Sequence, residues 1–125
     1  MNLVELRREL EDVLKNSKSK EIKIIKLLTD IIGFRILVND IDSCYKTLGI
    51  FHSKFSAIPG KFKDYISSPK INKYQSLHTA IIGPNKRPIE IQLRTMQMHE
   101  YAQRGIASHW KYKSSEKFNS LTWKE

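Results

Sequence analysis

The sequence predicts an α/β or α+β domain in which helices flank a small mixed β-sheet. Apolar residues recur at a helical spacing near the N-terminus and again between residues 43 and 55. Two short segments, 76–82 and 88–94, are rich in apolar residues and enclose a turn signal, which is typical of an antiparallel hairpin. The 125 residues fit one domain with one hydrophobic core.

The N-terminal region is predicted to be helical. Residues 3–16 place four leucines and a valine at a helical period and charged residues on the opposite face. Residues 17–20, Ser-Lys-Ser-Lys, interrupt this pattern and suggest a linker. We expect a second short helix over Glu21–Leu28, with Ile22 and Ile25 among the apolar residues on one side.

The central region begins with Ile31–Val38, whose β-branched and apolar residues predict a buried strand. A turn at Asp40–Asp42 leads into a helix predicted over Ser43–Phe55. The stretch Ala57–Tyr74 contains two prolines, a glycine and many lysines, with little periodicity, so we expect a long loop. Loops of more than a dozen residues are uncommon inside compact domains and are often functional.

The C-terminal half predicts two strands and a helix. Ser76–Ile82 and Pro88–Arg94 form the hairpin, and Thr95 is a good N-cap for a helix that continues to about Tyr112. We therefore divide the chain into an N-terminal helical segment (1–27), a domain (28–113) and a polar tail (114–125).

Cysteine content and hydropathy indicate the cellular compartment in which the protein works. Cys44 is the only cysteine, so no internal disulfide can form, which suits a reducing compartment. The apolar runs are far shorter than the ~20 residues that cross a bilayer, and the N-terminus lacks an apolar signal core. We expect a cytoplasmic protein without a membrane partner.

The charge is strongly basic and unevenly placed. The net charge is +9, of which residues 1–30 contribute +1 and the remainder +8. The excess of basic residues after residue 30 favours an anionic partner, such as a free nucleotide, a nucleic acid or a membrane surface. Solvated surface lysines explain the charge equally well, so charge alone does not decide between these.

The predicted strand Pro88–Arg94 carries the first candidate site. Side chains alternate across a sheet, so Glu90, Gln92 and Arg94 share one face and can bind a polar ligand. A solvated outer face is the commoner meaning of this pattern. Asp30, at the start of the first predicted strand, could pair with Glu90 to hold Mg²⁺, or it could be only a turn residue.

The long loop carries the second candidate site. Five lysines interleave with Phe62, Tyr65 and Tyr74 between positions 54 and 74, and Asp64 is the only acid there. Cations beside aromatic rings suit a phosphate group next to a stacked base, in a free nucleotide or a nucleic acid. A solvated loop with aromatic anchors is the alternative. His78, on the strand that follows, is the histidine best placed to contact a phosphate, and no glycine-rich phosphate loop occurs.

Several ordered motifs resemble the synthetase domain of the RelA/SpoT alarmone family. They cover about residues 28–113, which is most of the chain. The matching segments are Asp30–Arg35, Ile58–Ile66 (Ile-Pro-Gly-Lys-Phe-Lys-Asp-Tyr-Ile), Pro69–Lys70, Asn72–Thr79 (Asn-Lys-Tyr-Gln-Ser-Leu-His-Thr), Glu90–Thr95 (Glu-Ile-Gln-Leu-Arg-Thr) and Gly105–Lys113.

The resemblance implies a nucleotidyltransferase-like fold and a reaction. Members of this family move pyrophosphate from ATP to the 3′-hydroxyl of GTP or GDP and so make pppGpp and ppGpp. By this similarity Tyr74 would stack on guanine, and Asp30 and Glu90 would hold Mg²⁺. Glu90 would also help to deprotonate the hydroxyl. The remaining substrate-binding candidates, from the resemblance or from the strand pattern, are Asn72, Lys61, Lys63, His78, Gln92 and Arg94.

The chain also departs from the family pattern. The basic segment that holds the ATP phosphates in the family, with a Lys-x-x-Tyr-Ser-like pattern, has no counterpart in residues 1–29. We therefore expect a truncated domain, completed by a partner polypeptide or a homo-oligomer, or else an inactive guanine-nucleotide-binding remnant. An RNA-binding or ribosome-contacting fragment is a less favoured alternative. Lys73 stands where the family has glycine, and Lys61 where it usually has arginine.

Overall fold

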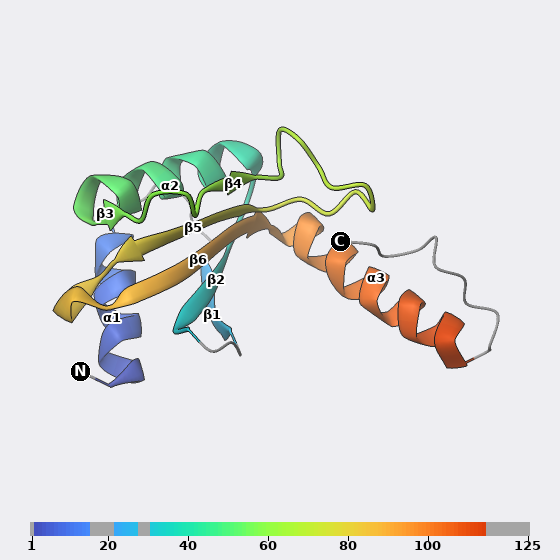
Figure 1. Ribbon diagram of the computed structural model, residues 1–125, viewed down its shortest axis with the longest axis horizontal. Helices are drawn as coiled ribbons and strands as arrows, with labels where there is room; N and C mark the ends of the chain where they lie inside the picture. The colour runs from blue at the N-terminus through green and yellow to red at the C-terminus, as the bar shows by residue number, and fades with distance from the viewer. Residues whose placement is uncertain (1, 16–21, 28–30, 115–125) are drawn as a thin grey trace.

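The computed structural model describes residues 2–15, 22–27 and 31–114, and the side chains of these residues up to Gly105. Its helices and strands, in chain order, are α1 (Leu3–Val13), β1 (Lys23–Leu27), β2 (Gly33–Val38), α2 (Ile41–Lys54), β3 (Ser56–Ala57), β4 (Lys63–Asp64), β5 (Leu77–Ile82), the 3₁₀ turn η1 (Pro84–Lys86), β6 (Pro88–Thr95) and α3 (Met96–Ser114) (Figure 1).

The strands form one mixed sheet in the order β1-β2-β6-β5-β3, and β4 also pairs with β5. β2 and β6 run parallel, and the other pairs are antiparallel. The predicted α/β or α+β class with a small mixed sheet is therefore confirmed. The predicted hairpin is also confirmed, because β5 and β6 pair antiparallel around η1.

Helices α1 and α2 cover one face of the sheet, whereas α3 continues from the end of β6 and extends away from the sheet (Figure 1). The core lies under the first two helices. Leu6 and Leu10 of α1 and Phe51 of α2 are fully buried there with Ile91 and Leu93 of β6. Within the described residues, no helix is long and apolar enough to cross a membrane.

The second short helix predicted over Glu21–Leu28 is wrong. Lys23–Leu27 is an edge strand that pairs antiparallel with β2, while residues 21 and 28 lie outside the described part. Ile24 and Leu27 are buried, whereas Lys23 is exposed. A five-residue apolar segment fits a helix or a strand equally well by periodicity. Pairing with β2, which the local sequence does not reveal, selects the strand.

The long loop is interrupted by two short strands that the sequence did not predict. β3 pairs with the end of β5, and β4 pairs with its beginning, so both ends of the segment are tied to the same strand. The N-cap prediction is confirmed, because the Thr95 hydroxyl accepts a hydrogen bond from the Met98 N–H at 3.1 Å. The polar tail, from residue 115 on, lies outside the described residues.

Candidate functional site

β6 lies between β2 and β5 and separates the core from the candidate site. Ile89, Ile91 and Leu93 are fully buried in the core, as the alternation predicts. On the other face Glu90 and Gln92 are half-buried, while Arg94 is only 2% exposed. A solvated outer face would leave all three polar side chains in water, so this alternative does not describe β6.

A transverse row of polar side chains crosses that second face. Arg35 of β2 is in register with Gln92, Gln92 with His78 of β5, and His78 with Lys63 of β4. Residues in register project from the same face, with Cβ atoms about 5 Å apart. The Arg35 Nε donates a hydrogen bond to the Gln92 Oε1 at 3.1 Å, which fixes the side-chain amide of Gln92.

A small cavity of about 110 Å³ opens on this row. Sites for whole small molecules measure about 300–1,000 Å³. The cavity therefore accommodates a phosphate group rather than an entire nucleotide. Thr79, Ala80 and Ile91 form part of its lining. The other five lining residues were predicted from the sequence: Lys61, Lys63, His78, Glu90 and Gln92.

Tyr74 is joined to this cavity through His78. The Tyr74 hydroxyl and the His78 Nε2 are 2.9 Å apart, and their rings meet edge-on with centroids 5.8 Å apart. Tyr65 contacts both rings edge-on, and the Lys70 Nζ lies 4.8 Å from the Tyr65 centroid and 5.6 Å from that of Tyr74. The predicted combination of cations and aromatic rings is therefore present at one end of the cavity.

The turn before Tyr74 is shaped by Asn72 and Lys73. The Asn72 Oδ1 accepts from the Tyr74 N–H at 3.0 Å, and the Lys73 N–H donates to the Lys70 carbonyl at 2.7 Å. Lys73 has a φ of 69°, in the left-handed region that favours glycine. The backbone at Lys73 therefore has the left-handed conformation that glycine adopts easily, and a lysine there lowers the stability of the fold. The Tyr101 hydroxyl donates to the Asn72 carbonyl at 3.1 Å and ties this turn to α3.

Asp64 anchors the segment that carries Lys61 and Lys63. Its carboxylate accepts from the Tyr45 hydroxyl at 2.9 and 3.1 Å and from the backbone N–H groups of residues 66 and 67. Burial raises the pKa of Asp64, but the hydrogen bonds from Ser67, Tyr45 and residue 66 together hold it below its usual value. Tyr45 was not predicted, because nothing in its local sequence marks it as a partner of the loop.

Arg94 lines neither this cavity nor the larger one described below. Its Nη2 lies 2.7 Å from the His99 Nδ1, and its guanidinium carbon lies 5.8 Å from the Tyr74 ring centroid. Burial, and to a smaller extent the nearby Arg35 cation, lower the pKa of Arg94 to about 10. Arg94 therefore contacts Tyr74, and its direct contact with a ligand stays a prediction.

The predicted magnesium site is only partly described. Glu90 presents a half-buried carboxylate to the small cavity, beside Lys61 and Lys63, which suits one hard oxygen ligand for Mg²⁺. Asp30, the second predicted ligand, lies outside the described residues. Among the described residues, no group of three or more histidine, cysteine, aspartate or glutamate side chains could hold a metal ion.

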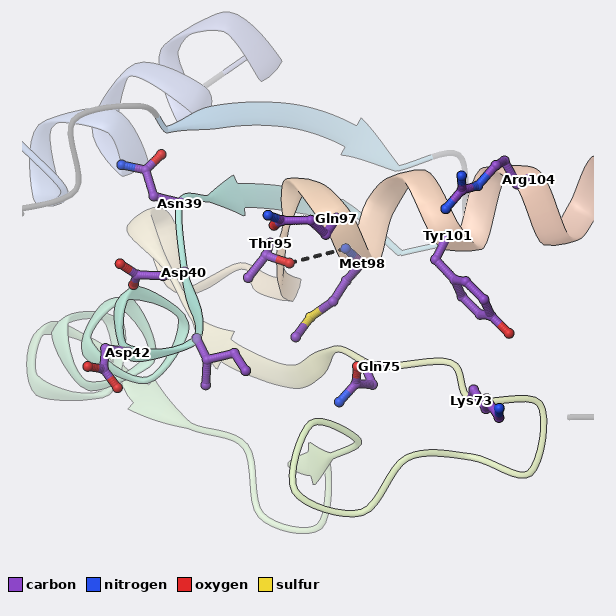
Figure 2. A pocket seen from close by; sticks show the side chains of 11 residues that line it. Asn39, Asp40, Asp42, Lys73, Gln75, Thr95, Gln97, Met98, Tyr101 and Arg104 are labelled. Atoms are coloured by element: carbon purple, nitrogen blue, oxygen red, sulfur yellow. Dashed lines mark hydrogen bonds between the residues drawn. The ribbon is translucent and has the colours of Figure 1, made fainter.

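A larger cavity of about 850 Å³ lies between the starts of α2 and α3 and the turn before Tyr74. Asp40 and Asp42 stand at one end, and Lys73, Tyr101 and Arg104 at the other (Figure 2). Its volume suits a nucleotide. Lys73, Gln75 and Thr95 of its lining lie in the motifs Asn72–Thr79 and Glu90–Thr95, but none of the individually predicted site residues lines it. Lys61, Lys63 and His78, which suit phosphate binding, line the small cavity, and we place the candidate site there.

Comparison with known proteins identifies similar sequences and similar structures. The model of the region found in RelA / SpoT proteins matches residues 7–117. A GTP pyrophosphokinase of Streptomyces antibioticus is 55% identical over 84 residues, which are 67% of this chain and 10% of that protein. A guanosine-3′,5′-bis(diphosphate) 3′-pyrophosphohydrolase of Aquifex aeolicus is 60% identical over 84 residues, 67% of this chain and 12% of that protein. The chain thus spans about a tenth of the length of such relatives.

Solved structures share the fold. The small alarmone synthetase 1 of Bacillus subtilis, solved bound to its product pppGpp, has a TM-score of 0.67 at 18% identity. The match covers 89% of this chain and 75% of that one. The small alarmone synthetase 2 of the same organism has a TM-score of 0.68 at 23% identity, over 90% of this chain and 76% of that one.

Proposed function

Because the chain belongs to the RelA/SpoT family, we propose that it forms the acceptor-nucleotide side of a (p)ppGpp synthetase domain. The reaction is transfer of pyrophosphate from ATP to the 3′-hydroxyl of GTP or GDP. One observation carries the proposal: five residues predicted from the sequence line one phosphate-sized cavity, and Tyr74 is hydrogen-bonded to one of them. The curated relatives named above act on guanosine nucleotides, which supports the same substrate class.

Tyr74 would hold the guanine base. It is half-buried, its backbone is fixed by Asn72, and its ring is braced edge-on by Tyr65 and His78. Stacking a base on an aromatic ring is worth roughly 1–3 kcal/mol. Such bracing reduces the freedom that Tyr74 loses when a base stacks on it, so more of that energy appears as affinity.

Lys61, Lys63 and His78 would bind the phosphates of the acceptor. β4 places Lys63 opposite His78 in register, and the Asp64 anchor holds the same segment against α2 through Tyr45. Phosphoryl-type transfer depends mainly on positioning and on neutralising charge. Lys61 and Lys63 at one small cavity supply the positive charge that neutralises phosphate, without a glycine-rich phosphate loop.

Glu90 would act at the reacting hydroxyl. Transfer forms a bond between the 3′-oxygen and the β-phosphorus of ATP and breaks the bond from that phosphorus to the α,β-bridging oxygen, so that AMP leaves. The 3′-hydroxyl proton passes to the Glu90 carboxylate, a general-base contribution of about 10²–10⁴-fold. Mg²⁺, held by Glu90 and Asp30, would neutralise charge on the transferred group.

A second candidate function is binding of a guanine nucleotide or alarmone without transfer. The cavity volume favours it, because about 110 Å³ holds phosphate groups of one nucleotide rather than of two.

Incubation with ATP, GDP and Mg²⁺, followed by chromatography of the products, tests the first function. Synthesis of ppGpp by the chain, alone or with a second copy or partner chain, is the expected result. Glu90→Gln should abolish it, whereas Lys15→Ala, a charge change on the helix-covered side, should not. Binding of GDP without any product under these conditions would leave only the second function. Binding of single-stranded RNA in place of GDP, weakening steeply with salt, would contradict both.

A further inference from the structure

Arg94 is the only charged residue that is buried in the described part of the chain. Its Nη2 is 2.7 Å from the His99 Nδ1, and its guanidinium lies over the Tyr74 ring at 5.8 Å. Its Nε is buried without a hydrogen-bond partner, and no described carboxylate forms an ion pair with it. A buried cation normally requires an acidic partner. Arg94 instead has a neutral imidazole and an aromatic ring.

His99 is the hydrogen-bond partner that fixes the guanidinium. A guanidinium only donates hydrogen bonds, so the His99 Nδ1 accepts and the ring proton is assigned to Nε2. α3 presents His99 from its first turn, and the Thr95 cap defines where that turn begins. Burial lowers the pKa of His99, and so do three nearby cations, those of Arg94, Arg35 and Lys23. These influences keep the imidazole neutral and able to accept.

β6 links this pair directly to the small cavity. Glu90 and Gln92 line the cavity, and Arg94, two residues further along the same face, contacts Tyr74. A single strand therefore sets the position of the phosphate subsite and of the ring that would receive the base. A cation on an aromatic face is attracted by the ring quadrupole and restrains the orientation of the ring.

We infer that Arg94 and His99 are positioning residues, which hold the Tyr74 ring in the orientation that receives the base of the acceptor nucleotide. The inference rests on the proposed function for the identity of the base, but the restraint on Tyr74 exists without any nucleotide. Arg94 touches the ring, and His99 acts through Arg94.

A pH dependence follows from the same contacts. Protonated His99 has no acceptor nitrogen and would place a second cation against Arg94, with Arg35 and Lys23 nearby. The hydrogen bond is therefore intact above the lowered pKa of His99 and is lost as the pH falls through it. We expect acceptor affinity to fall over that acidic range in the wild type but not in His99→Gln, whose amide oxygen still accepts.

Fluorine NMR of the full chain labelled with 3-fluorotyrosine tests the restraint without nucleotide. The Tyr74 resonance is assigned as the one lost in Tyr74→Phe. Arg94→Met and His99→Leu should shift or broaden this resonance. His99→Gln should leave it in place, as should the matched control Arg8→Met on the exposed side of α1. Thermal melts confirm that each compared variant is folded, and Arg94→Lys replaces Arg94→Met if the latter does not fold.

Calorimetry with GDP then separates this inference from the proposed function. Arg94→Met and His99→Leu should weaken GDP binding roughly tenfold, within the range of a partly desolvated cation–π contact, whereas His99→Gln and Arg8→Met stay within about twofold of wild type. An unchanged Tyr74 resonance in folded Arg94→Met or Arg94→Lys and in His99→Leu overturns the inference. If the resonance shifts as expected while wild type binds no GDP, the positioning pair stands and the proposed function fails.

Discussion

Replacing Lys73 by glycine should stabilise the protein, although lysine-to-glycine changes usually destabilise. Lys73 has a φ of 69° in the turn that precedes Tyr74. A non-glycine residue in the left-handed region costs roughly 1–2 kcal/mol. Glycine avoids that cost but loses roughly 0.5–1 kcal/mol through its greater freedom in the unfolded chain. The difference is a gain of about 0.5–1 kcal/mol, or a Tm higher by roughly 2–5 °C.

Chemical denaturation monitored by circular dichroism gives the free energy of unfolding for this comparison. Lys86, at a φ of 57° in η1, is a matched control outside the site, and Lys86→Gly should stabilise by a similar amount. Lys46→Gly, at an exposed position inside α2, should instead destabilise by about 1 kcal/mol. If Lys73→Gly lowers the free energy of unfolding as much as Lys46→Gly does, the left-handed turn and the reasoning from it are refuted.

Three further results are expected from the contacts around the loop. Tyr45→Phe removes the hydroxyl that donates to Asp64. A hydrogen bond typically contributes about 0.5–1.5 kcal/mol to stability, and because this pair is exposed we expect a loss at the lower end of that range. The same substitution should also raise the KM for the acceptor nucleotide more than that for ATP. The pKa of Asp64 is lower in the folded chain than the unfolded value near 3.8. Ionised Asp64 therefore stabilises the fold above that unfolded pKa, and this stabilisation is lost as the pH falls through the lowered folded pKa. In an acid titration of stability, Asp64→Asn should lack this loss. Burial, helped by Asp40, raises the pKa of Cys44 to about 12, so a disulfide reagent should react with it at neutral pH only when the chain unfolds.

The sequence predicted the elements whose patterns are long or bounded by clear signals. The alternation along 88–94 identified β6 and both of its faces, and Thr95 marked the start of α3. β1 was predicted as a helix because five apolar and basic residues do not fix a period. Its state depends on pairing with β2, which is a tertiary contact.

The sequence named five residues that gather at the small cavity, but it did not reveal the contacts that hold them there. Motifs placed Glu90, His78 and Lys63 in one site; the sheet register pairs His78 with Lys63, and Glu90 lines the same cavity. Arg94 is buried beside His99, from the first turn of α3, and Tyr74, and these contacts could not be inferred from strand alternation. The larger cavity also escaped prediction, because three segments far apart in the sequence line it (Figure 2). Lys73, Gln75 and Thr95 belong to two of the family motifs, but the sequence does not show that they face the starts of α2 and α3.

The most direct test of the guanine-acceptor site is calorimetric titration of the full chain with GDP and Mg²⁺, with Tyr74→Ala, Tyr74→Phe and Lys61→Ala as the comparison variants. The site predicts that GDP binds to wild type and that Tyr74→Ala weakens binding by roughly 1–3 kcal/mol, as expected for loss of a stacked base. Tyr74→Phe should keep most of the affinity, since it retains the ring, and Lys61→Ala should weaken binding in a salt-dependent manner. Equal binding of GDP by wild type and Tyr74→Ala, or no binding of GDP at all, would contradict the site.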